Sequence, residues 1–294
     1  MTFLLAHLSD AHIGPLPKPL RRELLNKRLT GYMNWLRRSQ IHDMKVLTAI
    51  VDDMKAQAPD HIAMTGDVMN IGLPAEFPIA KAWLETLGPT EDVSFTPGNH
   101  DAYVRASVPW IARTFGPWCA NDGDDVARFP YLRVRGEVAL IGLSSGVPTA
   151  PLLASGRLGL EQREKLASLL EETGRRGLMR VVMIHHPPTR RGASAGRGLS
   201  DARHFETVIR EKGAELVLHG HNHRLQVRHI EHEGRKIPVV GVASASAVPG
   251  TPAHRASYHL YRIEKRDNRW NIEATMRGTS AGTDHVMDLG SFPL

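Results

Sequence analysis

The sequence predicts an α/β fold in which helices cover β-sheet, and three observations predict it. Short apolar segments typical of buried strands alternate with segments whose apolar residues recur at helical spacing. The segments between 225 and 277 read as consecutive strands, which predicts antiparallel pairing. Of the 294 residues, 41% are hydrophobic and 23% are charged, which excludes a disordered or fibrous chain.

Strands and helices alternate in the first third of the chain. The five predicted elements are strand 3–9, helix 43–57, strand 61–65, helix 75–87 and strand 92–96. In the first helix, apolar residues recur at helical spacing from Val46 to Met54, and Pro59 follows its end. The second helix stops near Gly88. This order is the pattern of a sheet covered by helices.

The later elements continue this pattern and then become strands alone. They are helix 104–115, strands 130–135 and 138–144, helix 160–173, strand 180–184, helix 201–212, strand 215–218 and strands 225–232, 236–243, 256–264 and 269–277. Gly136 and Glu137 provide a hairpin turn between the first two strands. The stretch 189–199 is rich in Gly, Ser and Arg, which predicts a surface loop.

Candidate metal ligands directly follow five of the predicted strands. They are Asp10 and His12, then Asp67, then Asn99 with His100, then His185, and finally His221 and His223. Because ligands bind at the carboxyl ends of strands in open α/β sheets, we expect these side chains to meet. Carboxylate, amide oxygen and imidazole together suit borderline divalent cations such as Mn, Fe, Zn or Co.

This arrangement resembles the calcineurin-like metallophosphoesterases. The family pattern is Asp-x-His, Gly-Asp, Gly-Asn-His-Asp, His and Gly-His-x-His, and all five blocks are present in order. They read Asp10-Ala11-His12, Gly66-Asp67, Gly98-Asn99-His100-Asp101, His185 and Gly220-His221-Asn222-His223. A lone Asp-x-His is usually a polar turn, whereas five blocks in order are specific. The resemblance implies a four-layer αββα sandwich of two mixed sheets.

The resemblance also implies a site with two divalent metal ions. The first ion would take Asp10, His12, Asp67 and His223, and the second Asp67, Asn99, His185 and His221. A hydroxide that bridges the ions would attack phosphorus in line. His100 would face the phosphate, stabilise developing charge and protonate the leaving oxygen, and Asp101 is placed in the sequence to orient it. His186 and His219 are expected to support structure.

Within the family, the blocks and the run from His185 to Pro188 look like the bacterial cyclic-nucleotide and glycerophosphodiester branch. The resemblance therefore implies hydrolysis of a small phosphodiester. One alternative is hydrolysis of a lipid-linked phosphate or pyrophosphate at the membrane surface. The bacterial sugar-lipid pyrophosphatases usually carry Arg at the position of His100, which counts against that alternative. Another is a non-catalytic scaffold, but such scaffolds tend to have lost ligands that this chain keeps.

The net charge of +6 is confined to one segment. Residues 18–45 hold eight basic and two acidic side chains, whereas the rest of the chain has 29 of each. With 6% aromatic residues the chain offers few stacking platforms, so nucleic-acid binding is not expected. Cys119 is the single cysteine, which excludes an intrachain disulfide and fits a reducing, cytoplasmic compartment. No signal peptide or membrane-spanning run is readable.

The basic segment is predicted as an amphipathic insertion at about 15–42 in a single domain that spans 1–294. Gly31 is expected to interrupt a single helix there. Three interpretations stay open: the insertion packs on the domain as a solvated helix, it caps the site and binds anionic substrate, or residues 18–45 contact anionic lipid at the inner face of the membrane. The candidate substrate-binding residues are Arg21, Arg22, Arg28, Arg37 and Arg38.

Overall fold

The computed structural model describes residues 2–38, 40–248, 254–267, 269–280 and 285–294. In this part of the chain, two six-stranded sheets have the orders β12-β11-β10-β1-β2-β3 and β4-β5-β6-β7-β9-β8. The first sheet consists of β1 (Thr2–Leu8), β2 (His61–Met64), β3 (Val93–Phe95), β10 (Ser257–Arg266), β11 (Arg269–Thr279) and β12 (Val286–Phe292). The second consists of β4 (Tyr131–Arg135), β5 (Val138–Gly142), β6 (Met179–Met183), β7 (Leu216–His219), β8 (Gln226–His232) and β9 (Arg235–Gly241). Both sheets are mixed, since each combines parallel and antiparallel pairs.

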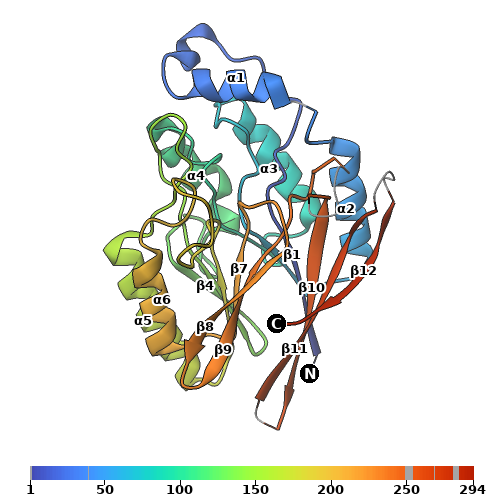
Figure 1. Ribbon diagram of the computed structural model, residues 1–294, viewed down its shortest axis with the longest axis vertical. Helices are drawn as coiled ribbons and strands as arrows, with labels where there is room; N and C mark the ends of the chain where they lie inside the picture. Colours follow the sequence, from blue (N-terminus) through green and yellow to red (C-terminus); the bar gives the residue numbers. More distant parts are fainter. Residues whose placement is uncertain (1, 39, 249–253, 268, 281–284) are drawn as a thin grey trace.

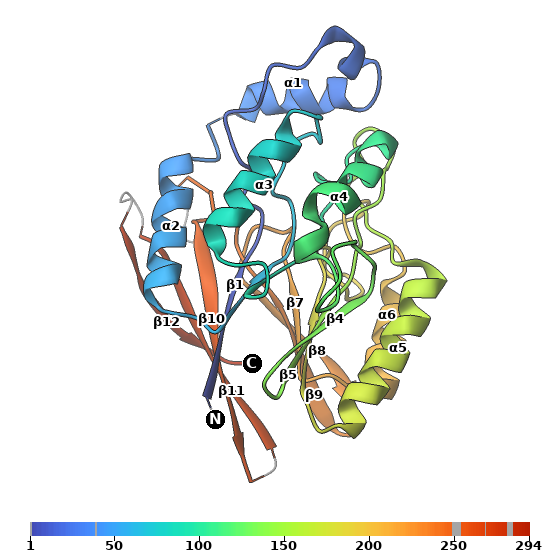
Figure 2. The ribbon, with the colours of Figure 1, turned by 180° about the vertical axis from the view of Figure 1, so that it is seen from behind.

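Helices cover the outer faces of both sheets, which confirms the four-layer αββα sandwich. The α-helices of the described chain are α1 (Arg28–Arg38), α2 (Met44–Ala56), α3 (Glu76–Leu87), α4 (Val108–Phe115), α5 (Gly159–Arg175) and α6 (Ala202–Lys212). Figures 1 and 2 show α2 and α3 beside the first sheet, α5 and α6 outside the second, and α1 at one end of the molecule. None of the helices in the described ranges is long and apolar enough to cross a membrane.

The core between the two sheets explains why the central strands read as continuous apolar runs. Every residue of β6 is buried, because this strand has a sheet on one side and helices on the other. Leu5 of β1 and Val181 of β6 belong to one buried cluster between the sheets. Each fully buried aliphatic side chain stabilises the fold by about 1.5–3 kcal/mol. This packing holds the strand ends that carry the candidate ligands.

Two features differ from the sequence-based expectation. The sequence does not predict β12, which pairs with β11 at the edge of its sheet and contains no fully buried residue, so it lacks the apolar pattern of the other strands. The expected interruption at Gly31 is wrong, because α1 runs through it. A Cβ at Gly31 would meet the Tyr103 hydroxyl and would lie 2.9 Å from Ile71 Cγ2. The glycine therefore permits close packing of α1.

Candidate metal centre

The candidate ligands lie where strands of the two sheets end side by side. Hydrogen bonds link the segments that follow strands of the two sheets there. Asp10, after β1, accepts at Oδ2 from the backbone N–H of His221, after β7, over 3.0 Å. The Nδ1 atom of His185, after β6, lies 2.7 Å from the carbonyl oxygen of Thr65, after β2. The site is therefore built jointly by both sheets, as the positions after the strands predict.

A left-handed backbone turns several of these side chains toward one another. The φ angle is positive at Asp10 (56°), His12 (41°), Asp67 (56°), His221 (68°) and His223 (52°). Each such non-glycine conformation costs of order 1–3 kcal/mol and persists only where the surroundings impose it. Gly98 contributes by allowing close approach, because a Cβ there would overlap Asp67 and the ring of His185.

Carboxylates and imidazoles meet at short distances in the centre. His185 Nε2 lies 3.1 Å from Asp67 Oδ2, and His223 Nε2 lies 3.1 Å from Asp10 Oδ1. Ligand atoms of Asp10, Asp67 and His185 lie within 4.8 Å of one another, and Asp67 belongs to a second such group with His12 and His100. Asp67 thus lies between two potential cation positions.

Burial and neighbouring charges set the protonation of the centre. Burial, with neighbouring imidazoles, holds the pKa of His221 and of His12 well below the usual value, so both rings are neutral at neutral pH. Burial opposes ionisation of Asp67, yet the adjacent His185 keeps the pKa of this carboxyl well below its usual value. Burial likewise opposes charge on His185, but Asp67 raises its pKa to about 9. The neutral rings of His12 and His221 and the ionised carboxylate of Asp67 are in the form that a divalent cation requires, whereas His185 would release its proton on binding one.

Unsatisfied polar atoms test whether the residues fit such cations. Asn99 Oδ1 and His221 Nε2 are buried without a hydrogen-bond partner, as is Asp10 Oδ1, apart from its ion pairing with histidine. A buried acceptor without a partner costs about 1–3 kcal/mol, so such atoms need an explanation. Coordination explains all three, and the donor set of carboxylate, amide oxygen and imidazole supports two divalent cations.

A family model described as calcineurin-like phosphoesterase matches residues 3–225. The chain belongs to the calcineurin-like phosphoesterase family. The match extends from the first strand of the sandwich to just beyond His223, and so includes every residue after a strand that the sequence predicts as a ligand.

Two curated relatives of this phosphoesterase chain carry names of phosphodiesterases. "Probable cyclic nucleotide phosphodiesterase syc0937_d" of Synechococcus sp. is 29% identical over 180 residues, which are 60% of this chain and 62% of that protein. "Glycerophosphodiester phosphodiesterase GpdQ" of Enterobacter lignolyticus is 24% identical over 234 residues, 76% of this chain and 71% of that protein. The chain thus spans less than two thirds of the Synechococcus relative.

Solved structures show the same fold at low identity. A dimetal phosphatase from Danio rerio superposes with a TM-score of 0.59 and 12% identity, and the match covers 99% of both chains. The purple acid phosphatase PPD1 from yellow lupin superposes with a TM-score of 0.61 and 13% identity over 99% of this chain and 53% of that one.

Asp101 has a different place in this chain from the one expected. Its carboxylate accepts from the backbone N–H groups of Gly98 and Asp67 at 2.8 Å, and from two further N–H groups in the loop after β2 at 3.1 Å. It holds the turns after β2 and β3 together. Asp101 and His100 bond to different partners, so the expectation that Asp101 orients His100 is wrong. Burial, with the charge of Asp67, raises the pKa of Asp101 to about 7. His100 Nδ1 instead bonds to the Asn70 carbonyl.

His186 and His219 differ in how close they lie to the centre. His219 Nδ1 lies 3.0 Å from the carbonyl of Gly220, within its own chain turn, as expected of a supporting residue. His186 Nδ1 bonds to Ser145 Oγ over 2.8 Å, but its ring also lies 4.6 Å from that of His221. It therefore lies directly beside the centre, and its Nε2 atom is buried without a hydrogen-bond partner, near the ligand atoms of His185 and His221.

A cavity of about 330 Å³ opens over the centre. The predicted site residues that line it are His12, Asp67, Asn99, His100, His221 and His223. Asp10 and His185 do not line it; both are fully buried. The insertion forms another wall of the cavity, with Lys27, Asn34 and Trp35 among its lining residues. The insertion therefore packs on the domain and also lies over the site.

Among the five candidate arginines of the insertion, Arg38 is the one that lines the cavity. Arg28 turns inward and is buried. Its guanidinium donates to the carbonyls of Ile71, at 3.2 Å, and Gly72, and to Ser107 Oγ. It anchors α1, so its expected contact with substrate is wrong. Arg21, Arg22 and Arg37 are exposed and line neither this cavity nor the one beside it.

Several residues that line the cavity were not predicted as site residues, among them Lys27, His42 and Arg197. Lys27 donates to Thr149 Oγ1 over 2.6 Å and to the Leu153 carbonyl over 3.0 Å, which ties the insertion to a distant loop. Arg197 comes from the loop at 189–199, and His42 from the end of the insertion. Nothing local in the sequence separates Lys27 or Arg197 from solvated cations. The only signal for His42 is the large number of histidines, 16 in the chain.

Proposed function

We propose that the protein is a dinuclear-metal-dependent phosphodiesterase that hydrolyses a small substrate such as a cyclic nucleotide or a glycerophosphodiester. The observation that carries the proposal is the convergence of carboxylates and imidazoles around Asp67 beneath a cavity. Asp10, His12, Asp67 and His223 would hold a cation at a first position, and Asp67, Asn99, His185 and His221 one at a second. When bound, two divalent cations supply Lewis acidity that activates water and neutralises phosphoryl oxygens.

His100 is the proposed catalytic acid. It lines the cavity, and its backbone N–H donates to Asp67 Oδ1 over 2.7 Å, which fixes its main chain beside the centre. Because Nδ1 donates to the Asn70 carbonyl, the other ring nitrogen, Nε2, is left to carry the proton that the leaving oxygen receives. Protonated His100 would also stabilise negative charge that develops on the phosphoryl group.

The cavity suits a small anionic substrate. Its volume of about 330 Å³ lies at the lower end of small-molecule sites. Lys27, Arg38 and Arg197 line it and provide positive charge, while Trp35 and Tyr103 provide flat apolar surface. The names of the two relatives agree with a small phosphodiester. The donor set favours Mn, Fe, Zn or Co as the cations.

A substrate panel tests this proposal. Metal-free protein is reconstituted with Mn²⁺, Zn²⁺ or Co²⁺ and given cyclic nucleotides, glycerophosphodiesters, nucleotide-sugar pyrophosphates and an aryl phosphodiester. We expect hydrolysis of phosphodiesters that requires added metal and is slowed by Asn99→Ala. Preference for the pyrophosphates, or turnover that persists in chelator, would contradict the proposal.

A second candidate, hydrolysis of a lipid-linked phosphate or pyrophosphate at a membrane surface, is favoured by the outer face of the insertion. Leu29, Met33 and Leu36 of α1 are exposed at helical spacing, and Leu25, just before α1, is 85% exposed. Along the chain, the exposed Arg21 and Arg22 precede this apolar stripe and the exposed Arg37 follows it, whereas Arg38 lines the cavity. Exposed apolar residues together with cations in one segment are typical of elements that lie in an anionic lipid interface.

Vesicle flotation separates the two candidates. If the protein acts at a membrane surface, the unmodified chain should bind vesicles of anionic phospholipid. Replacing Arg21, Arg22, Arg37 and Arg38 together by Gln should then weaken this binding. A matched control replaces four exposed arginines outside the insertion, Arg203, Arg235, Arg262 and Arg269. Equal flotation of both variants, or none by the unmodified chain, argues against action at the membrane.

A further inference from the structure

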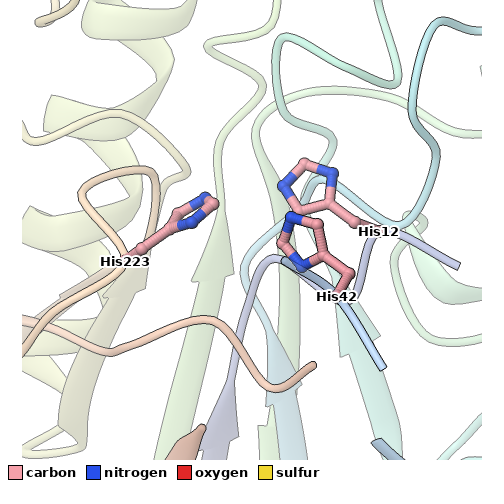
Figure 3. Close-up of side chains that lie close together, drawn as sticks. All are labelled: His12, His42 and His223. Carbon is pink, nitrogen blue, oxygen red and sulfur yellow. The ribbon is translucent and has the colours of Figure 1, made fainter. Parts of the chain in front are cut away.

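The insertion delivers a histidine to the centre that the family pattern does not include. His42 lies between α1 and α2, and its ring centroid is 4.5 Å from that of His12 and 5.9 Å from that of His223. One ligand nitrogen from each of these three residues lies within 4.8 Å of the others. Figure 3 shows the three rings gathered around a common space, each from a different segment of the chain.

The backbone around His42 is fixed on both sides. The carbonyl of Ile41 accepts from the N–H of Val248 over 3.0 Å, and the N–H of Asp43 donates to the carbonyl of Ser246 over 2.8 Å. The chain at 244–248 also supports the centre, because Ser244 Oγ donates to the Asp10 carbonyl over 2.7 Å. His42 is therefore held in place relative to the ligands without depending on the exposed part of the insertion.

The side chain of His42 has the arrangement of a metal ligand. Its Nδ1 lies 2.7 Å from Ser246 Oγ, so Nε2 is the ring nitrogen left for another partner. A ligating histidine generally uses its second ring nitrogen for such a hydrogen bond, which fixes the ring and its tautomer. His42 also lines the cavity, so a cation would reach it without rearrangement of the core.

We propose that His42 is a ligand of the cation at the first position, together with His12 and His223. This inference rests on the two cation positions proposed above. With three imidazoles, the first position would be richer in nitrogen than the second, which offers two imidazoles and an amide oxygen. It would therefore prefer Zn²⁺ or Co²⁺ to Mn²⁺ more strongly than the second position does. A cation bound there would also fasten the insertion over the cavity.

Metal titration of the full chain tests the proposal without reference to activity. The unmodified protein, His42→Ala and His42→Gln are stripped of metal and titrated with Zn²⁺ and with Mn²⁺ by calorimetry, and bound metal is measured after dialysis. His42→Gln retains a polar group for Ser246 Oγ and guards against misfolding of the alanine variant. We expect two ions per unmodified chain and at least a tenfold loss of Zn²⁺ affinity at one position in each variant. His229→Ala, which removes an exposed histidine, serves as the matched control.

Hydrogen exchange provides a second readout. In the unmodified chain, Zn²⁺ should slow amide exchange in α1, because the ion links the insertion to the sandwich, and this slowing should disappear in both His42 variants. Two ions bound to each variant with unchanged affinity would overturn the assignment of His42, even if substrate binding changed. Fewer than two ions on the unmodified chain would instead overturn the proposed dinuclear centre itself.

Discussion

At the scale of single residues, the centre depends on backbone conformations that residues other than glycine seldom adopt. Asp10, Asp67 and His221 each turn the chain sharply after a strand, which lets ligands from neighbouring turns face one point. Asp101 stabilises two of these turns with four accepted hydrogen bonds. The rigid sandwich and the buried Asp101 carboxylate thus hold this strain, and the strained turns keep the candidate ligands close together.

His100→Ala tests the division between ligands and catalytic acid. We expect turnover of an aryl phosphodiester to fall by roughly 10²–10⁴-fold, because the leaving oxygen loses its proton donor, while two metal ions stay bound. Metal content by elemental analysis and kcat are measured on the same sample. His204→Ala, on the exposed face of α6, is the control. Loss of metal from His100→Ala would mean that this residue is a ligand.

Residue types at strand ends made much of the centre predictable, because Asp, Asn and His follow the strands within short distances along the chain. Contacts between distant segments were not predictable. His42 reaches the centre only because the insertion folds back against the chain at 244–248. The inward turn of Arg28 depends on which face of α1 meets the domain, and a basic residue gives no local sign of that.

At the scale of elements, the main feature of α1 is its close packing against the rest of the domain. Tyr32 and Trp35 stack with their ring centroids 6.3 Å apart and pack against a buried cluster that includes Tyr103. Gly31 faces the same cluster. Helix propensity predicts an interruption at this glycine, but tertiary packing outweighs propensity, which is worth only about 1 kcal/mol. An edge strand such as β12 escapes prediction for a related reason, since little of it is buried.

Gly31→Ala should destabilise the protein although alanine favours helix by about 1 kcal/mol. The added methyl group would meet Tyr103 and Ile71, so we expect a net loss of about 1–3 kcal/mol in the free energy of unfolding, as for other overpacked sites. Urea unfolding measures it. Leu36→Ala, on the exposed face of the same helix, should change stability by less than about 0.5 kcal/mol. A more stable Gly31→Ala variant would refute the close packing of α1.

Buried histidines in the strands make stability depend on pH. Burial lowers the pKa of His61 in β2, and of His259 in β10, to about 3. The unfolded chain binds a proton at each near pH 6.5, whereas the folded chain does not until about pH 3, so stability falls as the pH falls through this range.

His61→Gln isolates that effect. Urea unfolding at pH 7, 6 and 5 should show the unmodified chain losing stability faster than His61→Gln, with a difference in slope of up to about 1.4 kcal/mol per pH unit. His229→Gln, which replaces an exposed histidine, should keep the slope of the unmodified chain. Parallel pH profiles of His61→Gln and the unmodified chain would contradict the assignment of His61 as a neutral buried ring.

At the scale of the whole molecule, the sandwich brings together ligands from both sheets, and the insertion adds the charge. The sandwich architecture was predictable, because alternating strands and helices specify layers and the five blocks specify the family. The position of the insertion over the cavity was not predictable, since it depends on packing around Arg28 and on the contact between Lys27 and Thr149. Of the eight basic side chains of residues 18–45, Lys27 and Arg38 line the cavity.

In the proposed mechanism, two cations held around Asp67 are required for the hydrolysis. Its most direct test is titration of the metal-free chain with Mn²⁺ while hydrolysis of an aryl phosphodiester is followed, for the unmodified protein and for Asp67→Ala. We predict that activity rises until two ions are bound per chain, and that Asp67→Ala shows no metal-dependent hydrolysis at any Mn²⁺ concentration. Activity that saturates at one ion, or that Asp67→Ala retains, would contradict hydrolysis by two cations.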